Sequence, residues 1–454
     1  MPVRQVPNSD RQYHLVTFDK NGNERRDDPD GVMSERVLDA LRAGGITDVF
    51  VVSHGWKGDV PAAIEQYDLW TGAMASAAAD VERMRARHPD YRPLIVGLHW
   101  PSEPWGEEEL GGAGGGAFSA SVGAAGESLA WSPDSLVELY ADRLSDDATP
   151  SDDLRVQIRL VVDAARQQIA PAQLPPEVVD AYRRIDQLAG LGSGELGDAP
   201  ANDRAPFEPQ RAYRATKSPG AAFGGVGNFL GGLLAPLRQL SFWKMKKRAQ
   251  TFGEGGAAQL LARMQDAAGP DTRFHVAGHS FGCIVVSAML RGAGGATGGR
   301  PPVHSAALLQ GALSLWSFAS RIEMAGGDPG YFRPLVDQRR VRGPIVTTQS
   351  RFDKAVGFWY PKAAGVAGQV AYALGVGELP KFGAVGTFGV QGDGTNAAGL
   401  DMLPAHESYG FTGGRIYNLN ADQYIRNGGG VSGAHSDIAH PEVAHAVWEA
   451  ALAE

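Results

Sequence analysis

Residues 273–290 read RFHVAGHSFGCIVVSAML, and they decide the fold class of the chain. The run 274–277 is short, apolar and typical of a buried strand, whereas 283–290 is apolar and compatible with a helix. Between them GHSFG, residues 278–282, matches the pattern G-x-S-x-G. In this pattern small residues allow the close packing of a sharp strand-to-helix turn that exposes a serine. We therefore predict a nucleophile elbow at Ser280. Its supporting residues would be Gly278, His279 and Gly282.

The composition is that of a globular protein, with 454 residues, 43% hydrophobic and 20% charged. A net charge of −9 argues against general binding of nucleic acid. The one cysteine, Cys283, excludes an intramolecular disulfide and favours a reducing compartment. The first ten residues are polar, and no run of 18 strongly apolar residues occurs. We therefore expect neither a signal peptide nor a spanning helix, and a cytoplasmic location.

Apolar strand patterns recur along the chain, at 13–18, 48–53, 93–100, 304–310, 344–349 and 415–420. Because helical patterns separate several of them, we expect an α/β fold with a mostly parallel central sheet and helices on both faces. The pair Asn21-Gly22 predicts a hairpin whose second strand covers 23–28. Ser34 would cap a helix over 35–43, and 61–87 would be one long helix.

The strand pattern stops over residues 101–240 and then resumes. This block contains a Gly/Ala/Ser tract at 111–126 and helical patterns at 133–144, 151–169 and 176–188. We therefore predict a large, mainly helical cap, or lid, at 101–240, inserted into a core made of 1–100 and 241–454.

Residues 221–243 are apolar and Gly-rich, and basic residues follow to position 248. An apolar segment beside a basic cluster can contact a membrane surface. The alternative, which we favour, is a lid over Ser280 followed by a solvated basic helix, because glycines and Pro236 weaken the apolar run. Peripheral membrane contact through 221–248 stays open.

The predicted strand 48–53 ends in His54-Gly55-Trp56. In hydrolases with a nucleophile elbow, the loop after such a strand supplies one backbone N–H of the oxyanion hole, and the residue after the serine supplies the other. We therefore predict the amides of Trp56 and Phe281 as the two donors, with His54 and Gly55 as supporting residues.

A nucleophilic serine needs a histidine base and an acid that orients it, and in this chain order the acid precedes the histidine. Asp353 follows the strand pattern 344–349, and His435 lies in a glycine-rich loop before the last helix. We predict a catalytic triad of Ser280, Asp353 and His435. The weaker candidates for the base and acid are His406, His440, His445 and Asp437. A strand-end ion pair of Asp353 with Arg351 or Lys354 is the alternative for that residue. No sequence pattern implies a metal or another cofactor.

With these residues assembled, the chain resembles the α/β-hydrolase superfamily. It is similar, more narrowly, to a group of largely uncharacterised bacterial α/β hydrolases, through residues 54–56, 100–102, 353–356, 416–421 and 435–438. The resemblance implies an α/β-hydrolase fold and hydrolytic chemistry, and it names no substrate.

We therefore expect a serine hydrolase that cleaves carboxylic esters, small or lipidic. Three alternatives remain on the same sequence features. The first is a thioesterase, amidase or peptidase with the same triad. The second is a binding protein whose cap closes the site. The third is a lipase that acts at membranes. The oligomeric state stays open.

Overall fold

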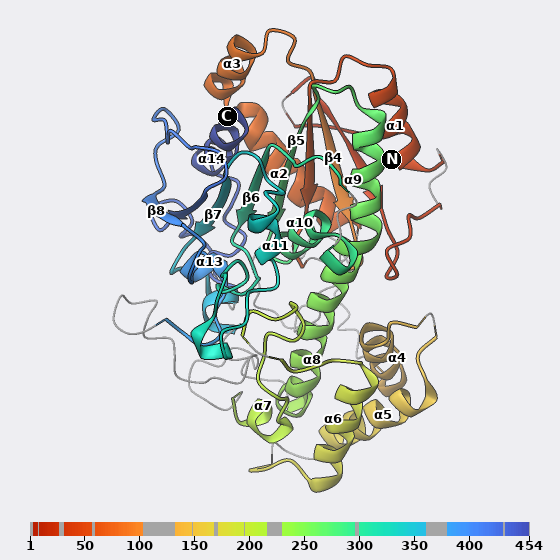
Figure 1. Cartoon of the computed structure of the whole chain (residues 1–454). Helices are drawn as coiled ribbons and strands as arrows, with labels where there is room; N and C mark the ends of the chain where they lie inside the picture. The colour runs from red at the N-terminus through yellow and green to blue at the C-terminus, as the bar shows by residue number, and fades with distance from the viewer. Residues whose placement is uncertain are drawn as a thin grey trace.

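The structure, a computed structural model, describes residues 3–7, 9–26, 31–56, 60–102, 132–147, 149–167, 171–194, 196–215, 229–295, 299–359, 379–429 and 432–453. Figure 1 shows two parts, a sheet flanked by helices in the upper half and a block of helices below it.

The described residues form a nine-stranded sheet. Its strands are β1 (Val3–Gln5), β2 (Gln12–Thr17), β3 (Asp48–Ser53), β4 (Pro93–His99), β5 (Arg273–His279), β6 (Ser305–Leu309), β7 (Ile345–Gln349), β8 (Ala398–Asp401) and β9 (Ile416–Asn420). Their order is β1-β2-β4-β3-β5-β6-β7-β9-β8, and every neighbouring pair except β1–β2 is parallel. The predicted α/β class with a mostly parallel sheet is confirmed.

Helices cover both faces of the sheet, as predicted. In β3 the side chains alternate, so that Val49 and Val51 face one apolar core and Phe50 and Val52 face the other. The first core is completed by α1 (Met33–Arg42), α9 (Ala258–Ala267) and α10 (Gly282–Arg291). The second is completed by α2 (Val60–Ser76), α3 (Ala78–Arg87) and α14 (Pro441–Leu452).

The lower block consists of α4 (Pro133–Leu144), α5 (Asp152–Gln167), α6 (Pro176–Leu188), α7 (Pro209–Ala215) and part of α8 (Phe229–Phe252). Ser132 caps α4 by accepting the Ser135 N–H, with Pro133 at the first turn. Between positions 101 and 240 the described residues contain helices and no strand. The tracts 103–131 and 216–228, which include most of the predicted Gly-rich segments, lie outside the described residues.

Helix α8 belongs to both parts of the molecule. Leu237 and Trp243 pack in the apolar core of the block, whereas Met245 and Ala249 pack in a core of the sheet. Figure 1 shows α8 rising from the block toward α9. The boundary that we placed after residue 240 therefore falls inside a continuous helix. Short elements complete the described fold: η1 (Gly253–Ala257), η2 (Ala293–Gly295), η3 (Glu323–Ala325), α11 (Arg333–Asp337), η4 (Ala355–Trp359) and α13 (Val385–Phe388).

The N-terminal region differs from the sequence prediction in two places. Residues 23–26 of the predicted second strand make one isolated bridge, Glu24 to Phe18, and residues 27 and 28 lie outside the described residues. The Asp19 carboxylate accepts the amides of Asn21 and Asn23 and closes the turn. The antiparallel partner of β2 is β1, which we did not predict.

Two helix predictions need correction as well. Ser34 does not cap α1, because it lies inside the first turn and donates its N–H to the Glu24 carboxylate at 2.8 Å. The helix predicted over 61–87 is two helices, since Ala77 leaves the helical conformation between α2 and α3. Both pack against α14, so tertiary contacts set the break. The irregular segment predicted at 377–412 contains α13 and β8.

Most basic residues at the end of α8 are not solvated, contrary to the expected exposed helix, although the Lys247 side chain is 35% exposed. Lys244, Lys246 and Arg248 are buried. Lys244 pairs with Asp146 at 2.7 Å, and Lys246 lies 4.6 Å above the Trp243 ring. Burial lowers the pKa of Lys246 to about 7, against the attraction of Asp203. These cations therefore do not form a surface cluster in the structure.

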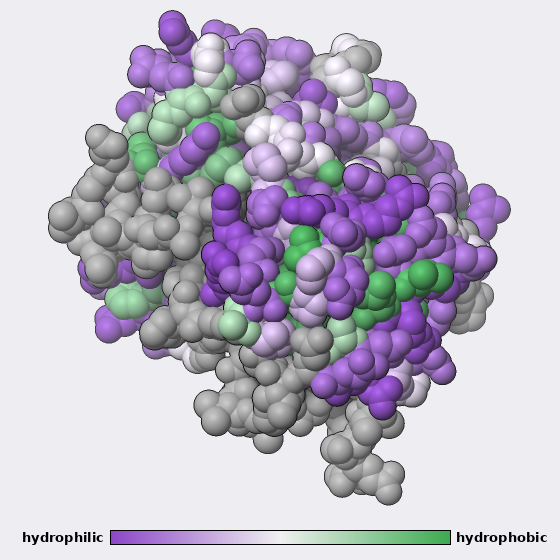
Figure 2. Space-filling view, turned by 90° about the horizontal axis from the view of Figure 1, so that it is seen from below, coloured by the Kyte–Doolittle hydropathy of each residue, from purple (hydrophilic) through white to green (hydrophobic). Residues whose placement is uncertain are grey.

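The surface of the block is mostly hydrophilic where the structure describes it. Figure 2 shows this face with hydrophobic residues in small groups among polar ones. In the described part of the chain no helix has the length and apolar character needed to cross a membrane.

Candidate active site

Ser280 occupies a strained turn between β5 and α10. Its φ of 55° lies in the left-handed region, which costs a residue other than glycine about 1–3 kcal/mol and is common at functional sites. Glycine is needed around it, because a Cβ on Gly278 would lie 2.3 Å from the Gly282 carbonyl oxygen, and one on Gly282 would lie 2.2 Å from that of Ser53. The strand–turn–helix predicted from 273–290 is therefore present.

The three predicted triad residues are in contact. His435 Nε2 lies 2.7 Å from Ser280 Oγ, and His435 Nδ1 lies 2.7 Å from Asp353 Oδ2. They come from loops after β5, β7 and β9, which meet at one sheet edge because the strands are parallel. Ser280 and Asp353 are 4% and 1% exposed, and the His435 side chain is 12% exposed.

The Asp353 carboxyl group accepts hydrogen bonds at both of its oxygens. Its Oδ1 accepts the Val356 N–H at 3.1 Å, and its Oδ2 accepts from Gln310 Nε2 at 2.8 Å in addition to His435. The alternative of a strand-end ion pair does not hold, because Asp353 pairs with His435 and not with Arg351 or Lys354, and Arg351 pairs with Asp422. A carboxylate on Nδ1 fixes the tautomer that leaves the Nε2 lone pair facing the Ser280 hydroxyl.

His279, the variable residue of the elbow pattern, supports the loop that carries His435. Its Nε2–H donates to the His435 backbone carbonyl at 2.8 Å, and its Nδ1 accepts from Gln66 Nε2 at 2.7 Å. Since the carbonyl can only accept, these two contacts assign the neutral Nε2–H tautomer. His279 therefore ties the elbow to the histidine loop through a hydrogen bond from its side chain to the main chain.

The predicted oxyanion loop packs directly on the elbow. A Cβ on Gly55 would lie 2.7 Å from Ser280 Cβ, so only glycine fits there. The Gly55 carbonyl accepts from His54 Nδ1 at 2.7 Å and from Ser102 Oγ at 3.1 Å. Because a peptide is planar, the N–H of Trp56 points away from those two donors.

The second predicted donor is the Phe281 N–H, at the residue that precedes α10. Among the residues that the structure describes, this N–H has no hydrogen-bond acceptor. The Phe281 ring stacks on Trp56 at 5.7 Å, and Phe242 of α8 packs against both rings. An aromatic cluster from the elbow, the oxyanion loop and α8 therefore lies beside the serine.

The weaker candidates for the base and acid lie elsewhere or have other partners. Asp437 accepts the backbone amides of Arg426 and Asn427 and pairs with His440 at 2.8 Å, so these contacts hold the histidine loop in shape. His406 has its side chain 81% exposed.

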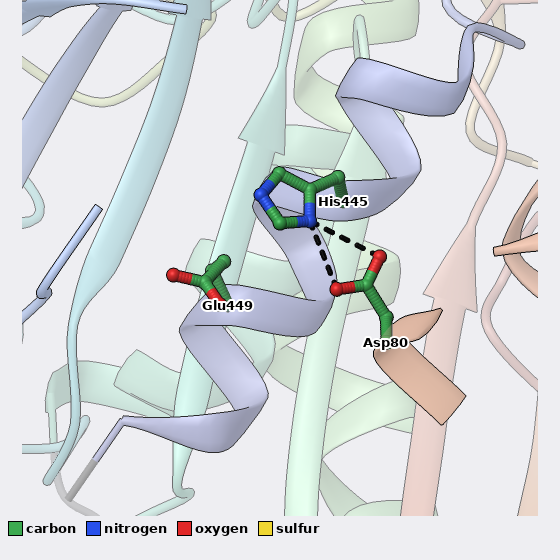
Figure 3. A group of neighbouring side chains, drawn as sticks. All are labelled: Asp80, His445 and Glu449. Atoms are coloured by element: carbon green, nitrogen blue, oxygen red, sulfur yellow. Dashed lines mark hydrogen bonds and ion pairs between the residues drawn. The ribbon is translucent and has the colours of Figure 1, made fainter. Parts of the chain in front are cut away.

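His445 belongs to a buried group with Asp80 and Glu449, whose ligand atoms lie within 4.8 Å of one another (Figure 3). This group has the donors of a metal site, but two cations of the protein already balance its carboxylates. Arg83 contacts both Asp80 and Glu449. Burial disfavours the charged imidazolium of His445, yet hydrogen bonds to Asp80 and to the Glu407 carbonyl outweigh it and raise its pKa. We therefore interpret the group as an ion-pair network that joins α3 to α14.

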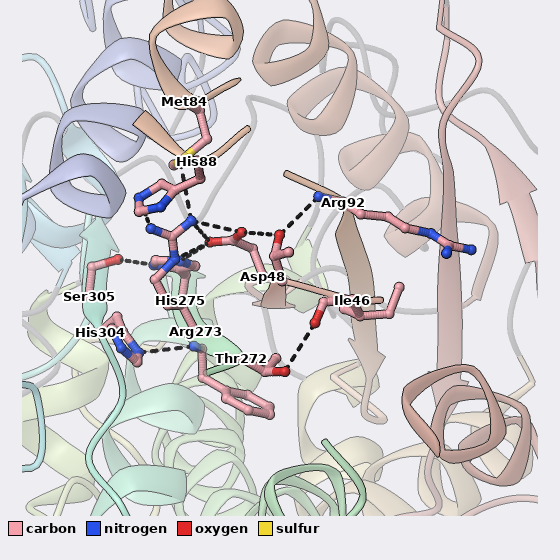
Figure 4. A network of polar contacts seen from close by, with 12 residues as sticks. Ile46, Asp48, Met84, His88, Arg92, Thr272, Arg273, His275, His304 and Ser305 are labelled. Atoms are coloured by element: carbon pink, nitrogen blue, oxygen red, sulfur yellow. Dashed lines mark hydrogen bonds and ion pairs between the residues drawn. The ribbon is translucent and has the colours of Figure 1, made fainter. Parts of the chain in front are cut away.

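A second polar network lies at the opposite edge of the sheet from Ser280 (Figure 4). Arg273 donates two hydrogen bonds of 2.9 Å to the buried Asp48 carboxylate, which also accepts from His275. His275 in turn accepts from Ser305 at 2.8 Å. These residues begin β3, β5 and β6, so the network joins the amino ends of the central strands.

The sequence interpretation missed two glutamines, Gln66 and Gln310, that contact the candidate site. Gln66 lies on α2, more than 200 positions before His279, and nothing in a single sequence relates the two. Gln310 ends the predicted strand 304–310, which pairs with the strand that precedes Asp353. A polar residue at the carboxyl end of that strand was the sequence signal that could have indicated it.

Comparisons with protein-family models, with curated proteins and with solved structures find no match for this chain.

Proposed function

We propose that this chain is an enzyme with an α/β-hydrolase fold, as its resemblance to that superfamily implies. More particularly, we propose a serine hydrolase that cleaves carboxylic esters. The observation that carries the proposal is the continuous hydrogen-bonded chain from Ser280 Oγ through His435 to Asp353, with 2.7 Å at each step. Its residues come from three separate loops, an arrangement that the general packing of a sheet does not require.

The reaction follows from the geometry. Ser280 Oγ attacks the acyl carbon while its proton passes to His435 Nε2. The proton then moves from Nε2 to the leaving alkoxide as the C–O bond breaks, which releases the alcohol and leaves an acyl-enzyme. Water attacks the acyl carbon, gives its proton to His435, and the acid departs as the proton returns to Ser280 Oγ. Asp353 stabilises the imidazolium in both halves and keeps its own charge.

The proposed oxyanion hole consists of the Trp56 and Phe281 amides. The Phe281 N–H stands at the amino end of α10, where the helix dipole favours negative charge. Each such donor contributes about 3 kcal/mol in related chemistry. The apolar rings of Trp56, Phe242 and Phe281 favour a substrate whose acyl group is apolar.

A second candidate is a binding protein with a closed site, and the low exposure of Ser280 and His435 favours it. A closed site would leave Ser280 unreactive toward acylating agents. The cap at 101–240, peripheral membrane contact through 221–248, and a cytoplasmic location remain proposals.

We expect a fluorophosphonate probe to label the protein at Ser280, and p-nitrophenyl esters of graded acyl length to be hydrolysed. Ser280→Ala should abolish labelling and lower kcat by about 10⁴-fold or more. Ser287→Ala is the matched control, since Ser287 is a buried serine on α10 outside the triad, and it should keep both activities. Matched thioester and anilide substrates would separate esterase from thioesterase and amidase activity.

Equal turnover by wild type and Ser280→Ala would refute the role of Ser280. Absence of labelling and turnover in wild type would favour the closed binding protein.

A further inference from the structure

Gln310 is a buried residue that contacts the acid of the candidate triad. It follows β6, is 0% exposed, and donates Nε2–H to Asp353 Oδ2 at 2.8 Å. Its second Nε2 hydrogen points to the Gly386 carbonyl at 3.1 Å. Asp353 Oδ2 therefore accepts from two side chains, His435 and Gln310.

Thr348 determines which way the Gln310 amide faces. The Thr348 hydroxyl donates to Gln310 Oε1 at 2.9 Å and accepts the Gln310 backbone N–H at 2.9 Å. A flipped amide would place Oε1 against the Asp353 carboxylate and the Gly386 carbonyl, which are both acceptors. Only one amide orientation satisfies all the partners, and it directs Nε2–H at Asp353.

The backbone at Gln310 is strained, which a role limited to packing does not explain. Its φ of 45° lies in the left-handed region, which residues other than glycine seldom adopt outside functional sites. Gly386 allows the close approach, because a Cβ there would lie 2.6 Å from the Gln310 carbonyl carbon.

The same segment also holds the elbow. Leu309 accepts the Ser280 N–H at 3.0 Å, and Ala312 donates its N–H to the Ser280 carbonyl at 3.1 Å. The chain from 309 to 312 thus contacts the nucleophile through its backbone and the acid through the side chain of Gln310.

We propose that Gln310, oriented by Thr348, is a positioning residue that holds the Asp353 carboxylate toward His435. This inference rests on the proposed serine hydrolase function. The Val356 N–H holds one carboxylate oxygen and Gln310 holds the other, so the carboxylate plane cannot rotate without losing a charge-assisted hydrogen bond. His435 then keeps the orientation that directs Nε2 at Ser280.

The test measures kcat, KM and the rate of fluorophosphonate labelling in full-length variants. Gln310→Met preserves length and removes the donor, and it should lower kcat and the labelling rate about 10-fold or more with little change in KM. Gln310→Glu should lower them further, because it places a second carboxylate where the amide faces Asp353. Thr348→Val should also lower kcat and the labelling rate, whereas Thr348→Ser, which keeps the hydroxyl, should have the wild-type values.

Two comparisons separate positioning from a structural effect. Thr347→Val removes a buried hydroxyl of the same strand that donates to Asn418, outside the triad, and it should leave kcat unchanged. The double variant Gln310→Met/Thr348→Val should be no slower than Gln310→Met, because the two residues act as one unit.

If Gln310→Met keeps the wild-type kcat and labelling rate, the role of Gln310 is refuted and the proposed function stays intact. If that variant does not fold, the same result in Thr348→Val refutes the role. A wild-type protein that the probe does not label would overturn the proposed function and this role with it.

Discussion

The conformation and packing of single residues at the elbow restrict which amino acids the candidate site can contain. Ser280 adopts a left-handed conformation, and the glycines at 55, 278 and 282 are needed because any Cβ there would overlap a neighbour. His279 and Gln310 add side-chain hydrogen bonds to the loops that carry the base and the acid. The geometry of the candidate site is therefore supported by buried, directional contacts as well as by the backbone.

His279→Leu should lower kcat about 5- to 10-fold with little change in KM, because it removes the donor to the His435 carbonyl and loosens the histidine loop. Steady-state kinetics on a cleaved ester would measure this. Gln66→Met, which removes only the donor to His279 Nδ1, should have a smaller effect. Equal kcat in His279→Leu and wild type would show that the loop does not need this contact.

At the scale of elements, the group of Asp80, His445 and Glu449 joins α3 to α14 (Figure 3). Glu449 also accepts from Ser408 Oγ at 2.6 Å and from the Tyr409 N–H at 2.9 Å, so the segment before β9 is held in place as well. Arg83 contacts both carboxylates, and hydrogen bonds to Asp80 and to the Glu407 carbonyl raise the pKa of His445, so groups of the chain itself pair with the acidic oxygens.

Arg83→Leu should reduce the free energy of unfolding by about 1–2 kcal/mol. This is less than for a fully buried pair, because the Arg83 side chain is 41% exposed. Denaturant unfolding would measure the loss, and Arg85→Leu, an exposed arginine of the same helix, should have almost no effect. We also expect EDTA to leave the melting temperature unchanged. A fall in melting temperature with EDTA would show that the group binds a metal.

At the scale of the whole molecule, the candidate triad and a second buried polar network lie at opposite ends of the strands of one sheet. The carboxyl ends of the strands carry the candidate triad, and their amino ends carry the network around Asp48. Burial opposes ionisation of Asp48, but hydrogen bonds to His275 and Arg273 outweigh it and lower its pKa to about 2. Burial and nearby positive charge lower the pKa of His304 to about 3, and burial lowers the pKa of His275.

These shifts predict loss of stability in acid. Below about pH 6.5 the unfolded chain binds protons at His275 and His304 while the folded chain does not, so the free energy of unfolding falls as pH decreases. Asp48 adds a further loss as pH falls from about 4 toward 2, since its folded pKa is lowered.

Unfolding by urea at several pH values between 7 and 4.5 would measure the slope. His304→Gln should reduce that slope by up to about 1.4 kcal/mol per pH unit, the value for one proton. His406→Gln, at an exposed histidine, should leave it unchanged. An identical slope in His304→Gln and wild type would contradict the assigned burial effect.

Much of this architecture follows from local sequence patterns. The runs 48–53, 274–277 and 415–420 read as strands because most of their residues are apolar or β-branched, and they lie in or overlap β3, β5 and β9. The pentapeptide 278–282 specifies a tight turn because only small residues allow it. Chain order then suggested Asp353 and His435, since the carboxyl ends of parallel strands meet at one edge.

Other features depend on contacts between residues far apart in the chain, which local patterns do not encode. The helix breaks at Ala77 because α2 and α3 each pack on α14. Strand β1 pairs with β2 although the first ten residues, which contain β1, are polar in sequence. Lys244 and Lys246 are buried because α8 runs through both parts of the molecule. Gln66 and Gln310 reach the candidate site only after the sheet has brought distant segments together. The sequence by itself indicated most of the central strands and the candidate triad residues, and the tertiary structure decided their partners, because hydrogen bonds and burial depend on distances in space.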